Sequence, residues 1–513
     1  MATAHAHATT MGQAAGRQAD HPAGTVRKAS PVIAFRHPID PLAPYRPVPV
    51  MNPSAALAAL WPLGGLPAQA LDMLTLTGCD PVFPSSFAVG CAAQVSIAAA
   101  ALAACELACV RGATRQRVAV DMAHASAECS GWFSLDGRQP ESWDAFAGLY
   151  RCADGHVRLH TNFRHHRDGA LRLLGLDPAT ASRADVERRL LDWPALDFEQ
   201  AANARGLVAT ALRSFAQWDT TAQGRAIAAQ APMTVSRLGA APPRALPALA
   251  DDERPLSRLR VLDLTRILAG PVGGRALAAL GADVMLVNSP GLPNIAAIAD
   301  TSRGKRSTHI DLRSASGCAR LWQLVEDAHV FSQGYRPGSL AALGFSPEAL
   351  AAHRPGIVVV SLSAYGDQGP WAERRGFDSL VQTAMGFNHA EGEAAGDGQP
   401  RALPMQILDQ ASGYLMAFGA AAALWHQQQE GGSWHVQVSL ARTAQWLRGL
   451  GRIAGGLLAQ SPDLAPWLDE TPSGFGVLRA VRPSVQLART PAGYARPSMP
   501  PGTDAPRWPD GTN

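Results

Sequence analysis

The segment Leu403–Leu440 reads LPMQILDQASGYLMAFGAAAALWHQQQEGGSWHVQVSL. A short apolar lead ends in one carboxylate, Asp409, and small residues with helical spacing follow over Ala411–Gln428. Two glycines end that pattern, and Trp434–Leu440 then alternates apolar and polar residues with the period of a strand. The segment therefore predicts a long helix with a carboxylate at its start, a turn and a strand.

Asp409 has two interpretations. Unpaired N–H groups and the positive end of the helix dipole favour the ionised form of a carboxylate just before a helix, and an ionised Asp can act as a nucleophile. Asp is also a preferred N-cap residue, so the side chain could do no more than cap the helix. The local sequence leaves both interpretations open.

Composition places the chain among globular proteins and excludes several classes. The 513 residues suffice for two or three domains, and 47% of them are hydrophobic while 17% are charged. A net charge of +3 gives no reason to expect binding to nucleic acid. The N-terminus lacks the apolar run of a secretion signal, and the apolar run Ala92–Ala104 is interrupted and too short for a membrane span. We therefore expect a cytoplasmic protein that binds neither nucleic acid nor a membrane.

The seven cysteines are odd in number, and most lie in apolar helical surroundings without CxxC pairs. This pattern indicates reduced core residues rather than disulfides or a zinc site. His165 and His166 have no carboxylate or cysteine partner at ligand spacing, so no metal site is expected.

The first half of the chain is expected to contain an arm and a small α+β domain. Residues 1–52, rich in Pro, Ala and His, predict a disordered arm. Within residues 53–250, a D-G turn between alternating runs predicts a hairpin over Tyr150–His160, and helices are expected at Ala184–Leu191 and Phe198–Leu212. The stretch Ala231–Arg258, rich in Pro and Ala, predicts a linker.

Residues 258–505 alternate strand and helix patterns, which indicates βαβ units. The expected strands are Arg260–Leu264, Ala282–Val287, His309–Leu312, Ala328–Phe331 and Ile357–Ser361. The predicted fold class is therefore α/β, with a parallel-sheet, Rossmann-like domain in the C-terminal half. Ligands of such sheets gather at the carboxyl ends of the strands.

Several motifs follow those strand ends. The Gly-rich turn 269–274 opens a helix, as a phosphate cradle would, but glycines there also allow a helix to pack closely on a strand. The motif is not GxGxxG, and the second strand ends in Asn288 rather than an acidic residue, so a dinucleotide enzyme is not expected. The basic cluster at Arg303, Lys305 and Arg306 suits a phosphate-bearing ligand or a solvated turn.

Taken in order, these motifs resemble those of the family III CoA-transferases, the CaiB/BaiF family. The matching segments are VLDLTRILAGP (261–271), RGKRS (303–307), YRPG (335–338), AYGDQGP (364–370) and GFD (376–378). The resemblance implies a catalytic aspartate at Asp409. It implies contacts to CoA from Arg266, Leu268, Ala269, Arg303, Lys305, Arg306, Tyr335 and Arg336.

The resemblance also implies the reaction. CoA would pass from an acyl-CoA to a small carboxylic acid through an aspartyl-CoA thioester, with the CoA thioester as substrate and no permanently bound cofactor. The reaction needs N–H donors for the oxyanion, and the backbone near Gln410 and Ala411 is a candidate.

The first half resembles the same family in part. Val95–Met122 resembles the helix and strand after the catalytic position, and Gly476–Pro497 resembles a closing segment that Met233–Pro247 repeats in shorter form. We therefore interpret the chain as two incomplete copies, with one catalytic centre because Gly90-Cys91 stands at the position of Asp409 in the first copy. The family forms interlocked homodimers, so a homodimer or a single-chain pseudo-dimer is expected.

Two alternatives stay open. An α-methylacyl-CoA racemase of this fold needs a His–Asp pair, but Phe377 stands where those relatives carry His and cannot transfer a proton. A non-catalytic acyl-CoA-binding pseudoenzyme is the other, because Asn288, Gly334 and Ala342 depart from the family's usual CoA-binding pattern.

Overall fold

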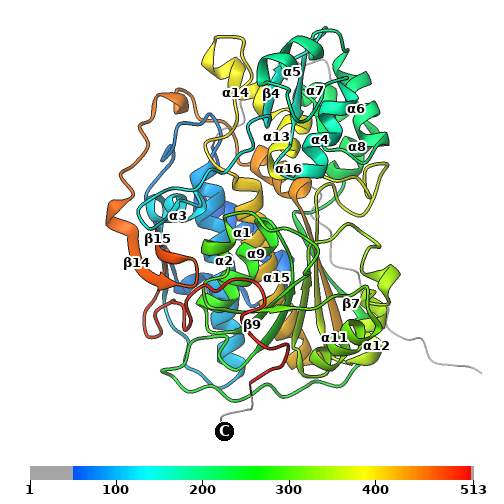
Figure 1. Ribbon diagram of the computed structural model, residues 1–513. Coiled ribbons are helices and arrows are strands. Elements are labelled where there is room, and N and C mark those ends of the chain that lie inside the picture. The colour runs from blue at the N-terminus through cyan, green and yellow to red at the C-terminus, as the bar shows by residue number, and fades with distance from the viewer. Residues whose placement is uncertain (1–49, 510–513) are drawn as a thin grey trace, which may run out of the picture. The chain divides into compact units, whose positions relative to one another are not determined.

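The computed structural model describes residues 50–509, so the expected arm at 1–52 lies outside the described residues except for its last positions. The central feature is a seven-stranded sheet of order β10-β9-β8-β11-β12-β13-β7 (Figure 1). Its strands are β7 (Met233–Gly239), β8 (Arg260–Leu264), β9 (Asp283–Asn288), β10 (Lys305–His309), β11 (Val330–Gln333), β12 (Val358–Ser363) and β13 (Ser433–Ser439). All neighbours are parallel except β13 and β7, which confirms a mixed α/β fold with a mostly parallel sheet.

Two details of this sheet correct the sequence-based expectations. β10 occupies Lys305–His309 rather than His309–Leu312, because the Lys305 side chain is buried and neutralised by an ion pair instead of marking a surface turn. β7 falls inside the expected linker, where Met233–Val438 and Val235–Val436 pairing adds it to the sheet as an antiparallel edge strand.

Alternation along the strands separates two cores. Val261, Val358 and Val436 face helices α2 (Val89–Val110), α9 (Ala269–Ala279) and α15 (Ile407–Glu430). Leu262 and Val359 face α11 (Ala315–Asp327) and α12 (Pro347–His353) on the opposite side. Successive strand residues point to opposite faces, so the sheet is buried on both sides, as parallel sheets are.

Helix α2 is longer than the apolar run that predicted it, since Cys105–Val110 continue the helix. By length and composition alone it could cross a membrane, so the argument that this run is too short was wrong. Most of its surface is buried, and it packs along α15. Its apolar composition is therefore accounted for by helix–helix packing.

The small α+β region forms a separate three-stranded antiparallel sheet, which confirms the expected hairpin. β4 (Gly148–Arg151) pairs with β5 (His156–Leu159), and β5 pairs with β6 (Ala209–Ala211). The covering helices are α4 (Arg164–Leu173), α5 (Arg183–Leu190) and α6 (Ala195–Ala204). The expected helix Phe198–Leu212 was too long, because Gly206 takes φ +68° after α6 and the chain then enters β6.

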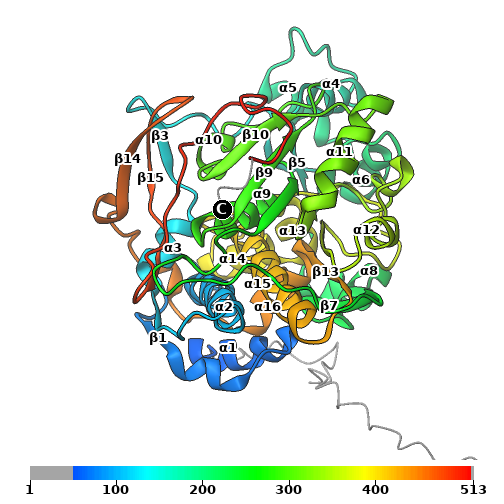
Figure 2. The same cartoon turned by 90° about the horizontal axis from the view of Figure 1, so that it is seen from below.

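Two further sheets join the first and last parts of the chain (Figure 2). One contains β1 (Leu74–Thr77), β2 (Val118–Asp121) and β16 (Val485–Leu487); the other contains β3 (Phe133–Leu135), β14 (Leu468–Ser473) and β15 (Gly476–Val481). Residues 53–250 and 258–505 therefore share sheets and are not separate bodies.

The remaining helices complete the covering layers. They are α1 (Pro53–Leu60), α3 (Met122–Cys129), α7 (Phe215–Thr220), α8 (Ala222–Ala228), α10 (Ile298–Thr301), α13 (Asp378–Met385), α14 (Phe387–Ala395) and α16 (Leu440–Gly449). Of these, α13 contacts β5 and β6 of the small region as well as α15 and α16. Helix α13 therefore connects the small region to the start of α15.

Candidate functional site

Asp409 lies in the first turn of α15, which begins at Ile407. It is the third helical residue rather than the N-cap, a position held by Gln406. The Gln410 N–H already donates to the Gln406 carbonyl within this turn at 3.1 Å, so it is not free for an oxyanion, contrary to our expectation. Asp409 is 8% exposed.

A second buried carboxylate, Asp378 at the first position of α13, contacts this turn. Its Oδ2 accepts a hydrogen bond from the Asp409 backbone N–H at 2.9 Å, and its Oδ1 accepts one from Gln382 Nε2 at 2.5 Å. Asp378 is the last residue of the GFD motif, and no role was predicted for it from the sequence. The signal that could have identified Asp378 is its position as the last residue of that motif and the first residue of a helix.

The two carboxylates perturb each other's titration. Burial raises the pKa of Asp378 to about 6, even though its hydrogen bonds favour the charged form. Burial, and then the charge of Asp378, raise the pKa of Asp409 well above its usual value. Burial and the like charge therefore oppose the expected effect of the helix start, which favours the ionised form of Asp409. A helix dipole contributes about 0.3–1 kcal/mol, which burial and a like charge exceed.

The position of Asp409 depends on close contact between α9 and α15. A Cβ atom added at Gly413, one turn after Asp409, would lie 2.5 Å from the Ala269 carbonyl oxygen. One added at Gly273 would lie 2.9 Å from the Gly413 carbonyl oxygen. The Gly-rich turn therefore serves helix packing here, one of the two roles that its sequence allowed.

Two of the residues expected to contact CoA are internal. Lys305 has no exposed surface and donates to Asp263 at 2.7 Å and to the Pro271 carbonyl at 2.8 Å. Arg303 is buried, pairs with Asp300 and donates to the Val481 carbonyl at 2.9 Å. Both stabilise the fold, so we withdraw them as CoA ligands.

Arg306 is partly buried on β10 and pairs with Asp283 at 3.0 Å. The remaining residues expected to contact CoA follow the ends of two neighbouring strands. Strands β8 and β11 are adjacent and parallel. Arg266, Leu268 and Ala269 follow the end of β8, and Tyr335 and Arg336 follow the end of β11. Arg266 donates to the Pro293 carbonyl, and Arg336 is exposed.

A basic cleft of about 540 Å³ lies between α6 and the loop that precedes α13. Its cations are Arg213, Arg336, Arg374 and Arg375, and Trp371 forms part of its wall. Apart from Arg336, these residues were not predicted from the sequence, because they come from segments far apart in the chain.

Only some of the arginines in the cleft form ion pairs with carboxylates. Arg213 and Arg374 both pair with Glu199, the latter at 2.6 Å. Arg375 donates to His166 Nε2 and to the Gly206 carbonyl, each at 3.1 Å, and burial followed by the charge of Arg336 lowers the pKa of Arg375. The cleft therefore offers positive charge to an anion. One of its cations, Arg375, is three residues before Asp378 in the sequence.

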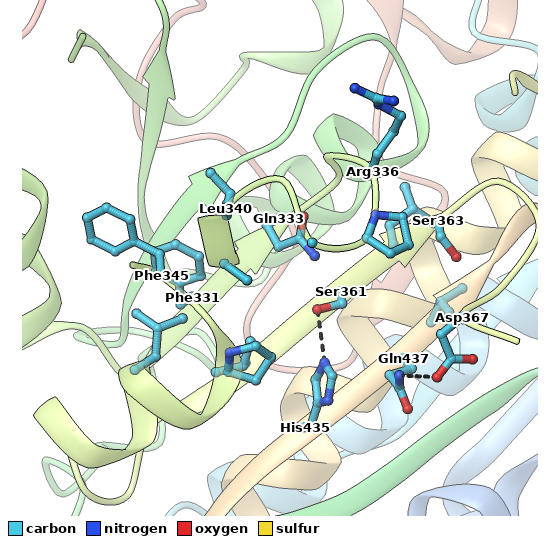
Figure 3. A pocket seen from close by; sticks show the side chains of 18 of the residues that line it. Phe331, Gln333, Arg336, Leu340, Phe345, Ser361, Ser363, Asp367, His435 and Gln437 are labelled. Atoms are coloured by element: carbon cyan, nitrogen blue, oxygen red, sulfur yellow. Dashed lines mark hydrogen bonds between the residues drawn. The ribbon is translucent and has the colours of Figure 1, made fainter. Parts of the chain in front are cut away.

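A smaller cavity of about 160 Å³ lies at the ends of β11, β12 and β13 (Figure 3). His435 meets Ser361 at 2.9 Å, and Gln437 donates to Asp367 at 2.8 Å. These strand residues alternate with valines that face α15, so the cavity is on the other side of the sheet from α15. It is separate from the carboxylate pair.

Part of the chain is similar to known proteins. Residues 256–451 match the family model described as CoA-transferase family III. The chain is 32% identical over 328 residues to an acyl-CoA transferase of Gibberella moniliformis, covering 62% of this chain and 54% of that protein. It is 34% identical over 206 residues to a succinate–glutarate CoA-transferase of Agrobacterium fabrum, covering 36% and 51%.

The chain spans about half the length of these curated relatives. A solved structure of a CaiB/BaiF family protein from Brucella suis is 28% identical, with a TM-score of 0.35 and coverage of 44% of this chain and 65% of that one. The C-terminal half, which contains Asp409 and Asp378, is therefore the part that the family model matches.

Proposed function

We propose that this protein transfers coenzyme A from an acyl-CoA to a carboxylic acid, with Asp409 as the nucleophile. The observation that carries the proposal is the buried pair of Asp409 and Asp378 at the start of α15, inside the region that matches CoA-transferase family III. Burial removes the water that would hydrolyse an activated acyl group.

The proposed reaction has four balanced steps. The Asp409 carboxylate attacks the thioester carbonyl, forming a C–O bond and releasing CoA thiolate, which leaves a mixed anhydride. The thiolate attacks the Asp409 carbonyl, which gives aspartyl-CoA and the donor acid. The acceptor carboxylate then attacks aspartyl-CoA and releases the thiolate again. Finally, the thiolate attacks the acceptor acyl group and frees Asp409.

Asp378 sets the starting state of this cycle. Two adjacent buried carboxylates resist double ionisation, so the Asp378 carboxylate, which accepts its own hydrogen bonds, favours the protonated form of Asp409. Attack requires the ionised form, so a proton on Asp409 must first pass to solvent water or to the Asp378 carboxylate. A cationic or hydrogen-bonding environment completed by substrate would assist this step.

The basic cleft is the proposed site for the phosphates of CoA. Arg336 and Arg375 supply charge that no carboxylate of residues 50–509 neutralises by direct pairing, and Trp371 offers a flat apolar surface. Guanidinium groups bind phosphate well because their paired N–H donors match its oxygens. Arg375 precedes Asp378 closely in sequence, so a ligand anchored there is near the carboxylate pair.

We also propose that the chain contains two part-copies that together form a pseudo-dimer. The parallel between α2 and α15 supports this: Cys91 is the third residue of α2, as Asp409 is of α15. Asp80 accepts the N–H groups of Gly90 and Cys91 at 3.0 and 2.7 Å, as Asp378 accepts that of Asp409. Light scattering tests this, since a particle of one chain mass supports a pseudo-dimer and twice that mass supports a homodimer.

Mass spectrometry tests the transferase proposal. The protein is incubated with acetyl-CoA, succinyl-CoA or hexanoyl-CoA, with and without hydroxylamine, beside Asp409→Asn and the matched control Asp80→Asn. A CoA-sized, hydroxylamine-labile adduct on the native protein and on Asp80→Asn, absent from Asp409→Asn, is expected. CoA binding without any adduct would instead support the pseudoenzyme alternative, and deuterium uptake at the α-carbon without transfer would support a racemase.

A further inference from the structure

Gln382 lies one turn after Asp378 in α13 and has no exposed surface. Residues four apart in a helix lie on the same face, so the Gln382 side chain can reach back to the Asp378 carboxylate. Its Nε2 donates to Asp378 Oδ1 at 2.5 Å, while the other oxygen of Asp378 accepts the Asp409 N–H. Gln382 is therefore connected to the start of α15 through Asp378.

The oxygen of the Gln382 amide is surrounded by donors. Its Oε1 accepts the Leu403 backbone N–H at 3.0 Å and the Asn388 Nδ2 group at 3.3 Å. If the amide were flipped, Oε1 would face the Asp378 carboxylate and Nε2 would face those two N–H groups. Acceptor would then meet acceptor and donor would meet donor. The surroundings therefore determine one orientation of the amide, with its NH₂ group on Asp378.

Asn388 is itself fixed by hydrogen bonds. It is buried, its Nδ2 also donates to the Arg401 carbonyl at 2.9 Å, and its Oδ1 accepts a hydrogen bond from Thr383 Oγ1 at 2.5 Å. The hydrogen bonds therefore run in one direction, from Asn388 through Gln382 to Asp378. A buried network whose members are hydrogen-bonded in this way is rigid.

The charged groups that act on Asp378 come from two other elements. Asp409 of α15 is a like charge, and Arg158 of β5 is an opposite charge. His160 stacks on Phe377, the residue before Asp378, with ring centres 4.0 Å apart. Burial lowers the pKa of His160 to about 3, so this ring is neutral.

The hydrogen bond from Gln382 favours the ionised form of Asp378. Burial raises the pKa of Asp378 to about 6, and the hydrogen bonds from the Asp409 N–H and from Gln382 oppose this rise. Burial, and then the charge of Asp378, raise the pKa of Asp409. The donation from Gln382 therefore affects Asp409 through Asp378.

We infer that Gln382 is a positioning residue for the proposed reaction, which fixes Asp378 as a hydrogen-bond acceptor against the first turn of α15 and thereby controls the ionisation of Asp409. The inference rests on the proposed function, because it concerns the nucleophile of that reaction. Without Gln382, the buried Asp378 carboxyl has one donor fewer and takes a proton more readily. Asp409 then ionises at lower pH, but in a less defined position.

The test measures the rate of adduct formation on Asp409 against pH, with acetyl-CoA, succinyl-CoA and hexanoyl-CoA. The variants are Gln382→Met, whose flexible side chain occupies similar space without an N–H donor, Asp378→Asn and the double variant. Gln427→Met is the matched control, because Gln427 is also buried, lies near the other end of α15 and donates to the Pro242 carbonyl at 3.3 Å. Thermal melting of each variant checks folding.

We expect the midpoint of the pH profile to fall by about one pH unit in Gln382→Met, and the maximal rate to fall about tenfold. Gln427→Met should keep the native midpoint. In the Asp378→Asn background, Gln382→Met should leave the midpoint unchanged, because no carboxylate remains at position 378 for Gln382 to act on. A purely structural role would lower the rates in both backgrounds without moving the midpoint.

Two results would overturn the inference: an unchanged midpoint in Gln382→Met, or the same shift in the native and Asp378→Asn backgrounds. If Gln382→Met does not fold, Asn388→Ala decides, since it removes one of the two donors that orient the Gln382 amide. A smaller shift in the same direction supports the inference, and no shift overturns it.

Failure of the proposed function gives a different result. Absence of an Asp409 adduct on the native protein at every pH would remove the proposed function and this inference with it. An adduct whose pH midpoint does not respond to Gln382→Met would remove the inference alone.

Discussion

The backbone N–H of Asp409 donates a 2.9 Å hydrogen bond to Oδ2 of Asp378, which fixes two buried carboxylates side by side. Asp378 thereby supports the first turn of α15 and at the same time disfavours ionisation of Asp409. The same contact thus links the structure of the helix start to the reactivity of the nucleophile. Five predictions follow from this pair and its surroundings.

Replacing Asp378 by Asn should make Asp409 easier to ionise. The amide oxygen can still accept the Asp409 N–H, but the neighbouring negative charge is gone, so the pKa of Asp409 should fall. The rate of adduct formation, measured against pH, should then begin its rise at lower pH than in the native protein. An unchanged pH profile would show that burial alone controls this titration.

Replacing Asp409 by Asn should stabilise the protein at neutral pH. The folded-state pKa of Asp409 is raised, so the folded state binds more protons than the unfolded state once pH exceeds the unfolded pKa, and stability falls as pH rises. The Asp409→Asn variant has no carboxyl group at this position, so its stability does not fall for this reason as pH rises. The melting temperature of Asp409→Asn should exceed that of the native protein at pH 7 and converge with it near pH 4; a constant difference would contradict the linkage.

Replacing Gly413 by Ala should displace the start of α15. The added methyl group would lie 2.5 Å from the Ala269 carbonyl oxygen and 2.8 Å from Val272 Cβ, which forces the helices apart. We expect a loss of about 1–3 kcal/mol in unfolding free energy and a marked loss of activity. Gly449→Ala, at the end of α16, is the control because nothing lies within 4 Å of its added Cβ. Equal effects of the two substitutions would contradict close packing as the cause.

Replacing Lys305 by Met should strongly destabilise the fold. The change leaves Asp263 buried beside an apolar chain, which costs about 3–5 kcal/mol by the usual penalty for breaking a buried ion pair. The double variant Lys305→Met/Asp263→Asn should recover part of this loss. Arg306→Ala, which breaks a more exposed pair on the same strand, should cost about 1 kcal/mol or less. Denaturant unfolding measures all three.

Replacing Arg336 or Arg375 by Ala should weaken CoA binding about tenfold each, because each removes one charged contact to phosphate. Pantetheine, which lacks phosphates, should bind the native protein and both variants alike. Arg401→Ala is the control, since Arg401 pairs with Asp397 on an exposed loop. Similar losses for pantetheine would place the phosphates elsewhere.

Much of the fold could be predicted from local patterns. Alternating strands and helices over residues 260–363 predicted a parallel sheet, and the D-G turn predicted the β4–β5 hairpin, since both depend on neighbours in sequence. The errors arose where long-range contacts decided the structure. Met233–Gly239 forms a strand because β13 is available to pair with it, and the basic residues of β10 are buried because Asp263 neutralises Lys305.

Part of the candidate site could likewise be predicted from local sequence, and part of it depends on tertiary contacts. The sequence by itself determined that one carboxylate, Asp409, begins a long small-residue helix, because helical spacing and the preceding apolar lead are local properties. Only the tertiary structure brought Asp378 to that carboxylate, since Asp378 begins a different helix, α13, whose contact with the start of α15 is not a local property. It also decided that the pKa of Asp409 is raised, because burial and a like charge depend on contacts across the fold.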